Sequence, residues 1–558
     1  MSEHTQQTNR PRGNRLRYTK GRQVDPDTVD ELRALLGGVP ARDQLIQALH
    51  GIQDHHGCLR HRHLAALADL MNLPFAEVYE VATFYSSFRV VEDDADVPEV
   101  VVQVCDSWVC AQHGARQLLE AVSGDAPPHV RVQAAPCLGR CAASPVAMVG
   151  RNAIDHADAE ALVAAATCGD TAAVLPPYTN LDDYRAAGGY RLLQACREGE
   201  TSFEDLTGAL DAAGLRGLGG AGFPTTRKWQ FVRGYTGPHY VVMNADESEP
   251  GTFKDRHCFE TDPHRVLEGL QIAAWAVEAE RAYIYLRDEY PAVRAILEEE
   301  IRRLDEAGLA LIPIELRRGA GAYICGEESA MLESVEGKRG LPRHRPPYVA
   351  EVGVFGRPTL VQNVETLYWI RDIVEKGPEW FAAQGVNGSK GLRHYSVSGR
   401  VREPGVKLAP AGLTARQLID DYCGGIADGH VFKGYLPGGA SGGILPASMD
   451  DIPLDFGKLE EHGCFIGSHA IMVLSDRDSI RDVALNLTRF FEEESCGQCT
   501  PCRVGTEKAV KLMGRDQWDG KLLKELSDVM ADASICGLGQ AAANPLRSSY
   551  RYFPEEVE

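Results

Sequence analysis

The 558-residue sequence predicts a multidomain protein of mixed α/β and α+β class. Three observations lead to this fold class. The length and the hydrophobic fraction of 44% suit several separate cores. Runs of β-branched residues with strand spacing alternate with helical patterns of apolar residues. Eight of the 15 cysteines form two groups, one just behind the first strands and one among the last helices, so each group belongs to a different unit.

The composition excludes several classes of function. The formal net charge of −21 argues against a nucleic-acid-binding surface, which needs clustered Lys and Arg. No uninterrupted run of about 18 apolar residues is present, so no membrane span is expected. The basic N-terminal stretch lacks the apolar run of a secretory signal. We therefore expect a cytoplasmic protein, in which many cysteines indicate metal or redox chemistry rather than disulfides.

The first part of the chain predicts a basic tail followed by a unit with both helices and strands. Residues 1–28 form the tail, and residues 29–170 open with apolar residues at helical spacing. Valine-rich runs at 100–104 and 130–132 then predict two strands, each placed just before a cysteine pair. A linker with two adjacent prolines, residues 171–178, leads into the next unit.

Three further units follow. Residues 171–390 alternate helical patterns with expected strands at 240–243, 282–286 and 311–316, each leading into a polar or Gly-rich loop. Residues 391–479 are Gly-rich with short strand-like runs, which predicts a small β-containing domain. Residues 480–558 return to helical patterns and carry the last cysteines. Ligands bind such sheets at the strand ends, so we expect the site in the first of these three units.

The first cysteine group consists of a C-x4-C pair, Cys105 and Cys110, and a C-x3-C pair, Cys137 and Cys141. Each pair follows a predicted strand, so two loops at one sheet edge would present four thiolates to one centre. Four thiolates hold either zinc or a [2Fe–2S] cluster, and structural zinc more often uses C-x2-C pairs. The spacing therefore favours iron–sulfur, with zinc as the alternative.

The second group has Cys496, Cys499 and Cys502 in a C-x2-C-x2-C run, with Cys536 remote. Three close thiolates bind three irons of a cube, and a remote fourth completes it. Zinc prefers paired knuckles, which this run is not, so a [4Fe–4S] cluster is expected. The other seven cysteines are expected to be small buried hydrophobic residues.

A glycine-rich loop at residues 214–223 contains a formal G-x-G-x-x-G at Gly217, Gly219 and Gly222. The dinucleotide-binding fingerprint must follow a strand, whereas residues 203–213 have helical spacing, so a standard Rossmann fold is rejected. Glycine still allows the backbone to approach a flat ring or a phosphate closely. A flexible loop is the alternative interpretation.

Two further loops have the composition of a ligand site. The polar loop 244–251 and the loop 319–328 each follow an expected strand. Lys228 is placed to reach a phosphate, and Phe231 to lie against a ring. Exposed loops are often acidic, so one of these features alone decides nothing. Three such loops in one α/β unit together indicate a bound cofactor.

Taken together, these motifs resemble the NADH-binding flavoprotein subunits of respiratory complex I and their soluble relatives, over nearly the whole chain. The resemblance implies FMN, NAD(H), one [2Fe–2S] cluster and one [4Fe–4S] cluster. It also implies a thioredoxin-like [2Fe–2S] domain, an FMN-binding α/β domain, a β-grasp-like domain and a C-terminal helical bundle with the [4Fe–4S] cluster. The family's cluster ligands map onto Cys105, Cys110, Cys137 and Cys141, and onto Cys496, Cys499, Cys502 and Cys536.

The resemblance also assigns cofactor contacts. Family FMN contacts map onto Gly217, Gly219, Gly220, Lys228, Asn244, Asp246, Glu247, Ser248, Tyr323, Gly326, Glu327 and Asn363. Nicotinamide-nucleotide contacts map onto Phe223, Phe231, Glu249 and Glu328. Further cofactor contacts are expected at Gly222, Arg345, Tyr348, Gln362 and Thr366. The sequence departs from the family where Leu218 replaces an arginine, Arg345 and Tyr348 replace lysine and phenylalanine, and Gln362 replaces an asparagine.

Two longer runs, residues 340–359 and 434–446, look most like the beta subunits of soluble NAD-dependent formate dehydrogenases. This implies a large alpha subunit with a molybdenum or tungsten bis-pterin centre and further iron–sulfur clusters. Electrons from formate would enter through the [4Fe–4S] cluster and leave from FMN as hydride to NAD+, with no side chain acting as a general acid or base. The alternatives are the diaphorase subunit of an NAD-reducing hydrogenase, a fused complex I module and, from another class, a zinc-bearing assembly scaffold.

Overall fold

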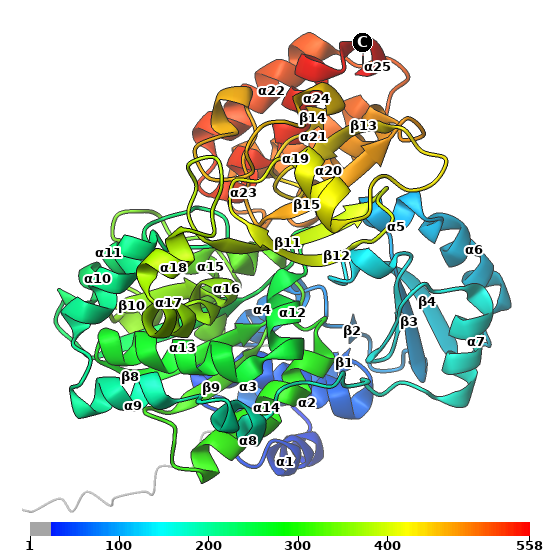
Figure 1. Ribbon diagram of the computed structural model, residues 1–558. Coiled ribbons are helices and arrows are strands. Elements are labelled where there is room, and N and C mark those ends of the chain that lie inside the picture. Colours follow the sequence, from blue (N-terminus) through cyan, green and yellow to red (C-terminus); the bar gives the residue numbers. More distant parts are fainter. Residues whose placement is uncertain (1–23, 558) are drawn as a thin grey trace, which may run out of the picture.

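The computed structural model describes residues 24–557 (Figure 1). Most of the predicted basic tail, residues 1–28, therefore lies outside the described residues, and its last three residues already belong to helix α1. The described residues contain four β-sheets, one of two strands, two of four and one of five. Among them, no helix is both long enough and apolar enough to cross a membrane.

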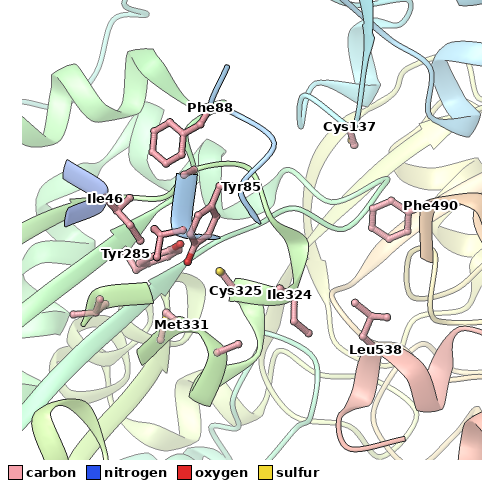
Figure 2. Packing of buried hydrophobic residues seen from close by; sticks show 14 of the residues in the cluster. Ile46, Tyr85, Phe88, Cys137, Tyr285, Ile324, Cys325, Met331, Phe490 and Leu538 are labelled. Atoms are coloured by element: carbon pink, nitrogen blue, oxygen red, sulfur yellow. The ribbon is translucent and has the colours of Figure 1, made fainter. Parts of the chain in front are cut away.

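The N-terminal segment is helical, as predicted, and its glycine-containing interruption separates the first two helices. Its elements are α1 (Pro26–Leu35), α2 (Leu45–His56), β1 (Leu59–Arg60), α3 (His61–Leu70), α4 (Phe75–Phe84) and β2 (Val90–Val91). Tyr85, just after α4, is fully buried against the central unit, where its hydroxyl donates to Ser334 Oγ at 2.9 Å. Figure 2 shows Ile46, Tyr85 and Phe88 packed beside Tyr285 and Cys325. These helices therefore share a core with the central unit.

The next sheet has the strand order β4-β3-β5-β6 and positions the first cysteine group. The predicted strands are confirmed as β3 (Val100–Cys105) and β4 (Val130–Ala135), which run parallel with Cys105 opposite Ala135. The other elements are α5 (Trp108–Gln112), α6 (Ala115–Asp125), β5 (Ala147–Val149), β6 (Asn152–Ile154) and α7 (Ala159–Cys168). Six of the seven ungrouped cysteines are buried, but Cys168, the last residue of α7, is exposed, so the prediction of burial was wrong there.

The central sheet is fully parallel, with the order β10-β7-β8-β9. Its strands are β7 (His239–Ala245), β8 (Ala279–Leu286), β9 (Ile314–Arg318) and β10 (Thr359–Asn363). Strand β9 begins three residues later than predicted, directly after Pro313, and the short β10 was not predicted. The helices are α8 (Leu181–Ala186), α9 (Arg191–Glu198), α10 (Phe203–Ala213), α11 (Thr225–Arg233), α12 (Lys254–Thr261), α13 (Pro263–Ala276), α14 (Pro291–Glu306), α15 (Glu328–Val335), α16 (Val364–Tyr368), α17 (Ile370–Lys376) and α18 (Pro378–Ala382).

The five-stranded sheet and the last helices form the upper part of Figure 1. The sheet has the order β12-β11-β15-β13-β14 and comprises β11 (Leu392–Gly399), β12 (Gly405–Pro410), β13 (Phe432–Leu436), β14 (Leu445–Pro446) and β15 (Ala470–Ser475), with the short helix α19 (Ala415–Gln417). The helices are α20 (Ile480–Glu493), α21 (Thr500–Met513), α22 (Gly520–Ala533), α23 (Gly537–Ala541), α24 (Asn544–Tyr552) and α25 (Pro554–Val557). The multidomain fold class predicted from the sequence is confirmed.

Candidate functional site

A cavity of about 550 Å³ lies beyond the carboxyl ends of the central strands. All three predicted loops contribute to its wall. The predicted residues that line it are Gly219, Gly220, Asn244, Asp246, Glu247, Ser248, Glu249, Tyr323, Gly326, Glu327 and Asn363. A cavity of this volume is in the range of small-molecule and cofactor sites.

The glycine-rich loop follows α10, as the sequence predicts, and is pinned at its base. The backbone N–H of Leu218 donates to Thr366 Oγ1 at 2.9 Å. A Cβ on Gly219 would lie 3.1 Å from Asn363, whereas Gly220, with φ +141°, faces open space. The loop therefore presents bare backbone to the cavity, which a flat ring or a phosphate can approach closely.

The loop after β7 is ordered by its own polar side chains. Asn244 Nδ2 donates to the Gly326 carbonyl at 2.9 Å, which ties two of the loops together. Ser248 Oγ donates to Asp246 Oδ1 at 2.8 Å. The other oxygen, Oδ2, is buried in the cavity wall without a hydrogen-bond partner. Burial raises the pKa of Asp246 to about 8. An orphaned buried carboxyl atom fits a polar ligand in this cavity.

Glu247 and Glu249 hold parts of the cavity wall together through hydrogen bonds. Glu247 accepts hydrogen bonds from the N–H groups of Asp255 and Arg256 at 2.7 and 3.0 Å, and burial raises its pKa to about 7. Glu249 accepts from the N–H and the hydroxyl of Ser441, at 2.8 and 2.5 Å. The first carboxylate anchors the start of α12, and the second joins the central unit to the five-stranded sheet unit.

The third loop connects the cavity to the C-terminal helices. The N–H of Tyr323 donates to Glu494 Oε2 at 2.8 Å, and Glu494 lies two residues before Cys496. Burial raises the pKa of Glu494 to about 7. Glu327 accepts from the N–H groups of Ser329 and Ala330, which caps α15.

Several predicted contacts stand outside the cavity lining. Phe223, Phe231 and Tyr348 are 43%, 50% and 59% exposed, which is unusual for large aromatic residues. Lys228 Nζ lies 3.1 Å from Glu328 Oε2, and Arg345 pairs with Glu327 and Glu328. The remaining residues belong to the framework of the loops or to strand β10, and they are Gly217, Gly222, Gln362 and Thr366.

Other lining residues were missed by sequence reasoning. Lys254 is 1% exposed and lies between Asp255 and Glu365, with Nζ–O distances of 2.8 and 3.1 Å. Ser441 and Phe456 come from the five-stranded sheet unit, and Leu538 comes from α23. Lys254 has no distinguishing motif, and the others lie far from the three loops in the sequence.

The first cysteine group converges on one sheet edge, as predicted. Cys105 ends β3, Cys110 lies in α5, and Cys137 and Cys141 follow β4. All four thiols are buried, and the sulfurs of Cys137 and Cys141 are 3.5 Å apart.

The second cysteine group gathers at helix starts beside the cavity. Cys499 precedes α21 directly, and Cys536 precedes α23, whose first residues line the cavity. Cys502 is buried, while Cys496, Cys499 and Cys536 are partly exposed. Helix N-termini favour anionic groups such as thiolates.

The donor sets of the two cysteine groups fit iron–sulfur clusters. Four buried thiols meet at one sheet edge in the first group, and in the second group three closely spaced cysteines are joined by the remote Cys536. Iron–sulfur clusters are held by such four-thiolate sets.

Comparisons with known proteins agree with this geometry. The Nuo51 FMN-binding domain matches residues 210–372, the thioredoxin-like [2Fe–2S] ferredoxin matches 38–167, and the NADH-ubiquinone oxidoreductase-F iron–sulfur binding region matches 482–558. The F 2 subunit of the NADH-quinone oxidoreductase of Rhizobium meliloti (strain 1021) is 41% identical over 392 residues, which cover 67% of this chain and 93% of that protein. The chain belongs to the family of NADH-quinone oxidoreductase F subunits.

Other comparisons add a second relative from this family and a structural neighbour. The F subunit of the NADH-quinone oxidoreductase of Aquifex aeolicus is 40% identical over 400 residues, which cover 69% of this chain and 92% of that protein. A chain of an NAD+-reducing [NiFe]-hydrogenase in the H2-reduced state superposes with a TM-score of 0.81 at 31% identity. That match covers 93% of this chain and 94% of the other, so it includes the N-terminal units as well.

The family membership defines the class of activity. The protein is an electron-transfer diaphorase subunit that handles NAD(H), with FMN, a [2Fe–2S] and a [4Fe–4S] cluster as cofactors. The zinc-bearing scaffold has no support, because both cysteine groups fall within matched iron–sulfur regions.

Proposed function

We propose that the cavity holds FMN through the residues assigned from the sequence. When bound, FMN exchanges two electrons with NAD(H) as hydride and single electrons with iron–sulfur clusters. The bare backbone at Gly219 and Gly220 supports the flat ring, and Asp246 Oδ2 offers an unused polar partner inside the cavity. Asn244 and Asn363 orient the surrounding loops through hydrogen bonds to Gly326 and Asp255.

We infer that the nicotinamide nucleotide binds at the exposed aromatic residues. Phe223 and Phe231, with ring centroids 6.4 Å apart, offer stacking surfaces, and Tyr348 offers a third for adenine. Arg345 supplies a cation for the phosphates of this nucleotide and Lys228 one for the FMN phosphate, and both are held by the carboxylate of Glu328. Nucleotide binding would exchange these ion pairs for phosphate contacts.

We propose that the partner subunit oxidises formate, so that this chain is the beta subunit of an NAD-dependent formate dehydrogenase. The proposal depends on the runs 340–359 and 434–446. The first run contains Arg345 and Tyr348, and the second supplies Ser441, which holds Glu249 beside the cavity. Electrons would enter through the partly exposed cysteine group and reach FMN through the wall at Leu538. The alpha subunit would carry the molybdenum or tungsten bis-pterin centre and further clusters.

A second candidate is the diaphorase subunit of an NAD+-reducing hydrogenase. The observation that favours it is the match over 93% of the chain to a hydrogenase chain of the same overall organisation.

The deciding experiment is anaerobic reduction of the purified native complex, followed by visible spectra and iron–sulfur EPR. Parallel samples receive formate, H2 or NADH. We expect formate and NADH to bleach the spectrum and H2 to leave it unchanged. Bleaching by H2 instead of formate would replace the formate proposal with the hydrogenase candidate. Bleaching by NADH alone would contradict both partners and favour a complex I module.

A further inference from the structure

Arg287 links the first cysteine group to the cavity loop. It follows β8 and is only 2% exposed. Its Nη2 donates to the Cys137 carbonyl at 2.6 Å, and its Nη1 donates to the Glu247 carbonyl at 2.5 Å. One side chain therefore holds a predicted cluster ligand and a cavity residue through a rigid planar fork, which the flexible ammonium of lysine cannot reproduce.

Tyr290 and Gly139 complete the contact. The Tyr290 hydroxyl donates to Glu247 Oε2 at 3.0 Å, and the Arg287 guanidinium lies 4.8 Å from the centre of the Tyr290 ring. Gly139, between Cys137 and Cys141, has φ +66°, and a Cβ there would come within 2.2 Å of the Tyr290 hydroxyl. At Gly139, the cysteine loop thus packs closely against Tyr290, which supports the cavity loop.

Several charged groups lie close to this contact, among them Asp246 and Glu494, which both interact with Arg287. Arg287 Nε lies 3.2 Å from Glu289 Oε2, and Glu289 is 16% exposed. A buried cation interacts with a neighbouring charge more strongly than an exposed one, because water screens it less. Reduction of a four-thiolate [2Fe–2S] cluster adds one negative charge, so a fixed cation beside its ligand loop favours the reduced form.

We propose that Arg287 is a positioning residue that fixes the Cys137 loop against the cavity loop and raises the reduction potential of the [2Fe–2S] cluster, while Glu289 tempers this effect. The inference depends on the proposed ligands Cys105, Cys110, Cys137 and Cys141. The Arg287 side chain would thus have two tasks. Its hydrogen bonds hold the cysteine loop beside the cavity loop, and its positive charge raises the reduction potential of the cluster.

The test is a potentiometric EPR titration of the [2Fe–2S] signal in the native complex and in two variants. Arg287→Met removes the cation, and we expect the [2Fe–2S] midpoint potential to fall. Glu289→Gln removes the tempering anion, and we expect the midpoint potential to rise. The [4Fe–4S] midpoint potential, measured in the same samples, serves as the reference and is expected to shift much less.

The outcomes separate this inference from the assignment on which it depends. Absence of a [2Fe–2S] signal from the native complex would remove the ligand assignment itself. A native signal whose midpoint potential is unchanged in both variants, or moves the same way in both, would overturn the role of Arg287. If Arg287→Met fails to assemble the cluster, Glu289→Gln decides alone, and an unshifted midpoint potential rejects the proposal. Arg287→Lys keeps the charge, so we expect its [2Fe–2S] midpoint potential to stay close to the native value while the EPR line shape changes.

Discussion

The two cysteine sites differ in how far the protein covers them. Cys105, Cys110, Cys137 and Cys141 are all buried at a sheet edge, and their loop is held against the cavity loop by Arg287. In the second group, only Cys502 is buried. Because electron transfer to another protein chain needs close approach, the partly exposed site is suited to exchange with a partner, and the enclosed site to exchange within the chain. The cavity contacts both sites, through α23 next to Cys536 and through Glu247, which Arg287 joins to the Cys137 loop.

The largest expected effect separates these two roles directly. Cys502→Ser removes a [4Fe–4S] ligand, and we expect near-complete loss of NAD+ reduction driven by the partner subunit, with NADH–ferricyanide activity retained. Cys105→Ser is the matched change at the enclosed site, and we expect it to retain most partner-driven turnover. The measurements are the steady-state rates with NAD+ and with ferricyanide as electron acceptors, and the rate of peroxide release. Equal losses in the two variants would contradict the division of roles, and unchanged peroxide release in Cys105→Ser would remove a kinetic role for the [2Fe–2S] cluster.

The next effect concerns the cavity between the two sites. Asp246→Ala removes the unused buried oxygen and leaves its hydrogen-bonding partner on FMN unsatisfied in the cavity, which costs about 1–3 kcal/mol and weakens FMN binding roughly 5- to 150-fold. FMN release on dilution, measured by fluorescence, gives the dissociation constant. Asp183→Ala is the control, because Asp183 is exposed and does not line the cavity. Identical affinities in the native protein and Asp246→Ala would show that this carboxyl does not contact FMN.

One glycine in each cysteine loop allows the packing around the two sites to be compared by substitution with alanine. Gly139 and Gly497 both have positive φ, +66° and +77°, but a Cβ on Gly497 would meet nothing closer than 3.9 Å. Gly497→Ala therefore has only the backbone cost of about 1–2 kcal/mol. Gly139→Ala adds a clash with Tyr290, about 1–3 kcal/mol more. We therefore expect a lower thermal midpoint for Gly139→Ala than for Gly497→Ala. Equal midpoints would mean that the enclosed loop is not tightly packed.

A further effect is a pH dependence of stability. Burial raises the pKa of Asp246 to about 8, so the folded flavin-free protein keeps a proton that the unfolded chain releases near its ordinary pKa of 3.8. The folded state binds more protons between these values, so the free energy of unfolding falls as the pH rises from about 4 to about 8. Denaturation of flavin-depleted protein across this range should show the fall, and Asp246→Asn should reduce it, with the remaining fall coming from Glu247 and Glu494, whose pKa values burial also raises. The exposed Asp183→Asn is the control, and a native profile as flat as that of Asp246→Asn would contradict the prediction.

Much of the fold could be predicted from local sequence patterns. The helix 203–213 and the strands that deliver Cys105 and Cys137 were predicted because apolar spacing and β-branched runs act within a few residues. The strand β10 was missed because Leu360 and Val361 are its only apolar residues, so it has neither a continuous apolar run nor an alternating pattern. In the cavity, the three loops were found from glycine and polar content. Ser441 and Leu538 were not, because only tertiary packing brings them there, and Lys254 was not, because it follows the loop after β7 without a distinguishing motif.

The same long-range packing has a consequence for biogenesis. The cavity wall includes Gly537, Leu538 and Ala541, from the last short stretch of a 558-residue chain. During synthesis, the glycine-rich loop and the loop after β7 leave the ribosome long before α23 exists. The wall of the proposed flavin pocket is therefore complete only after α23 has been made, and a chain interrupted before residue 537 would lack one side of that pocket.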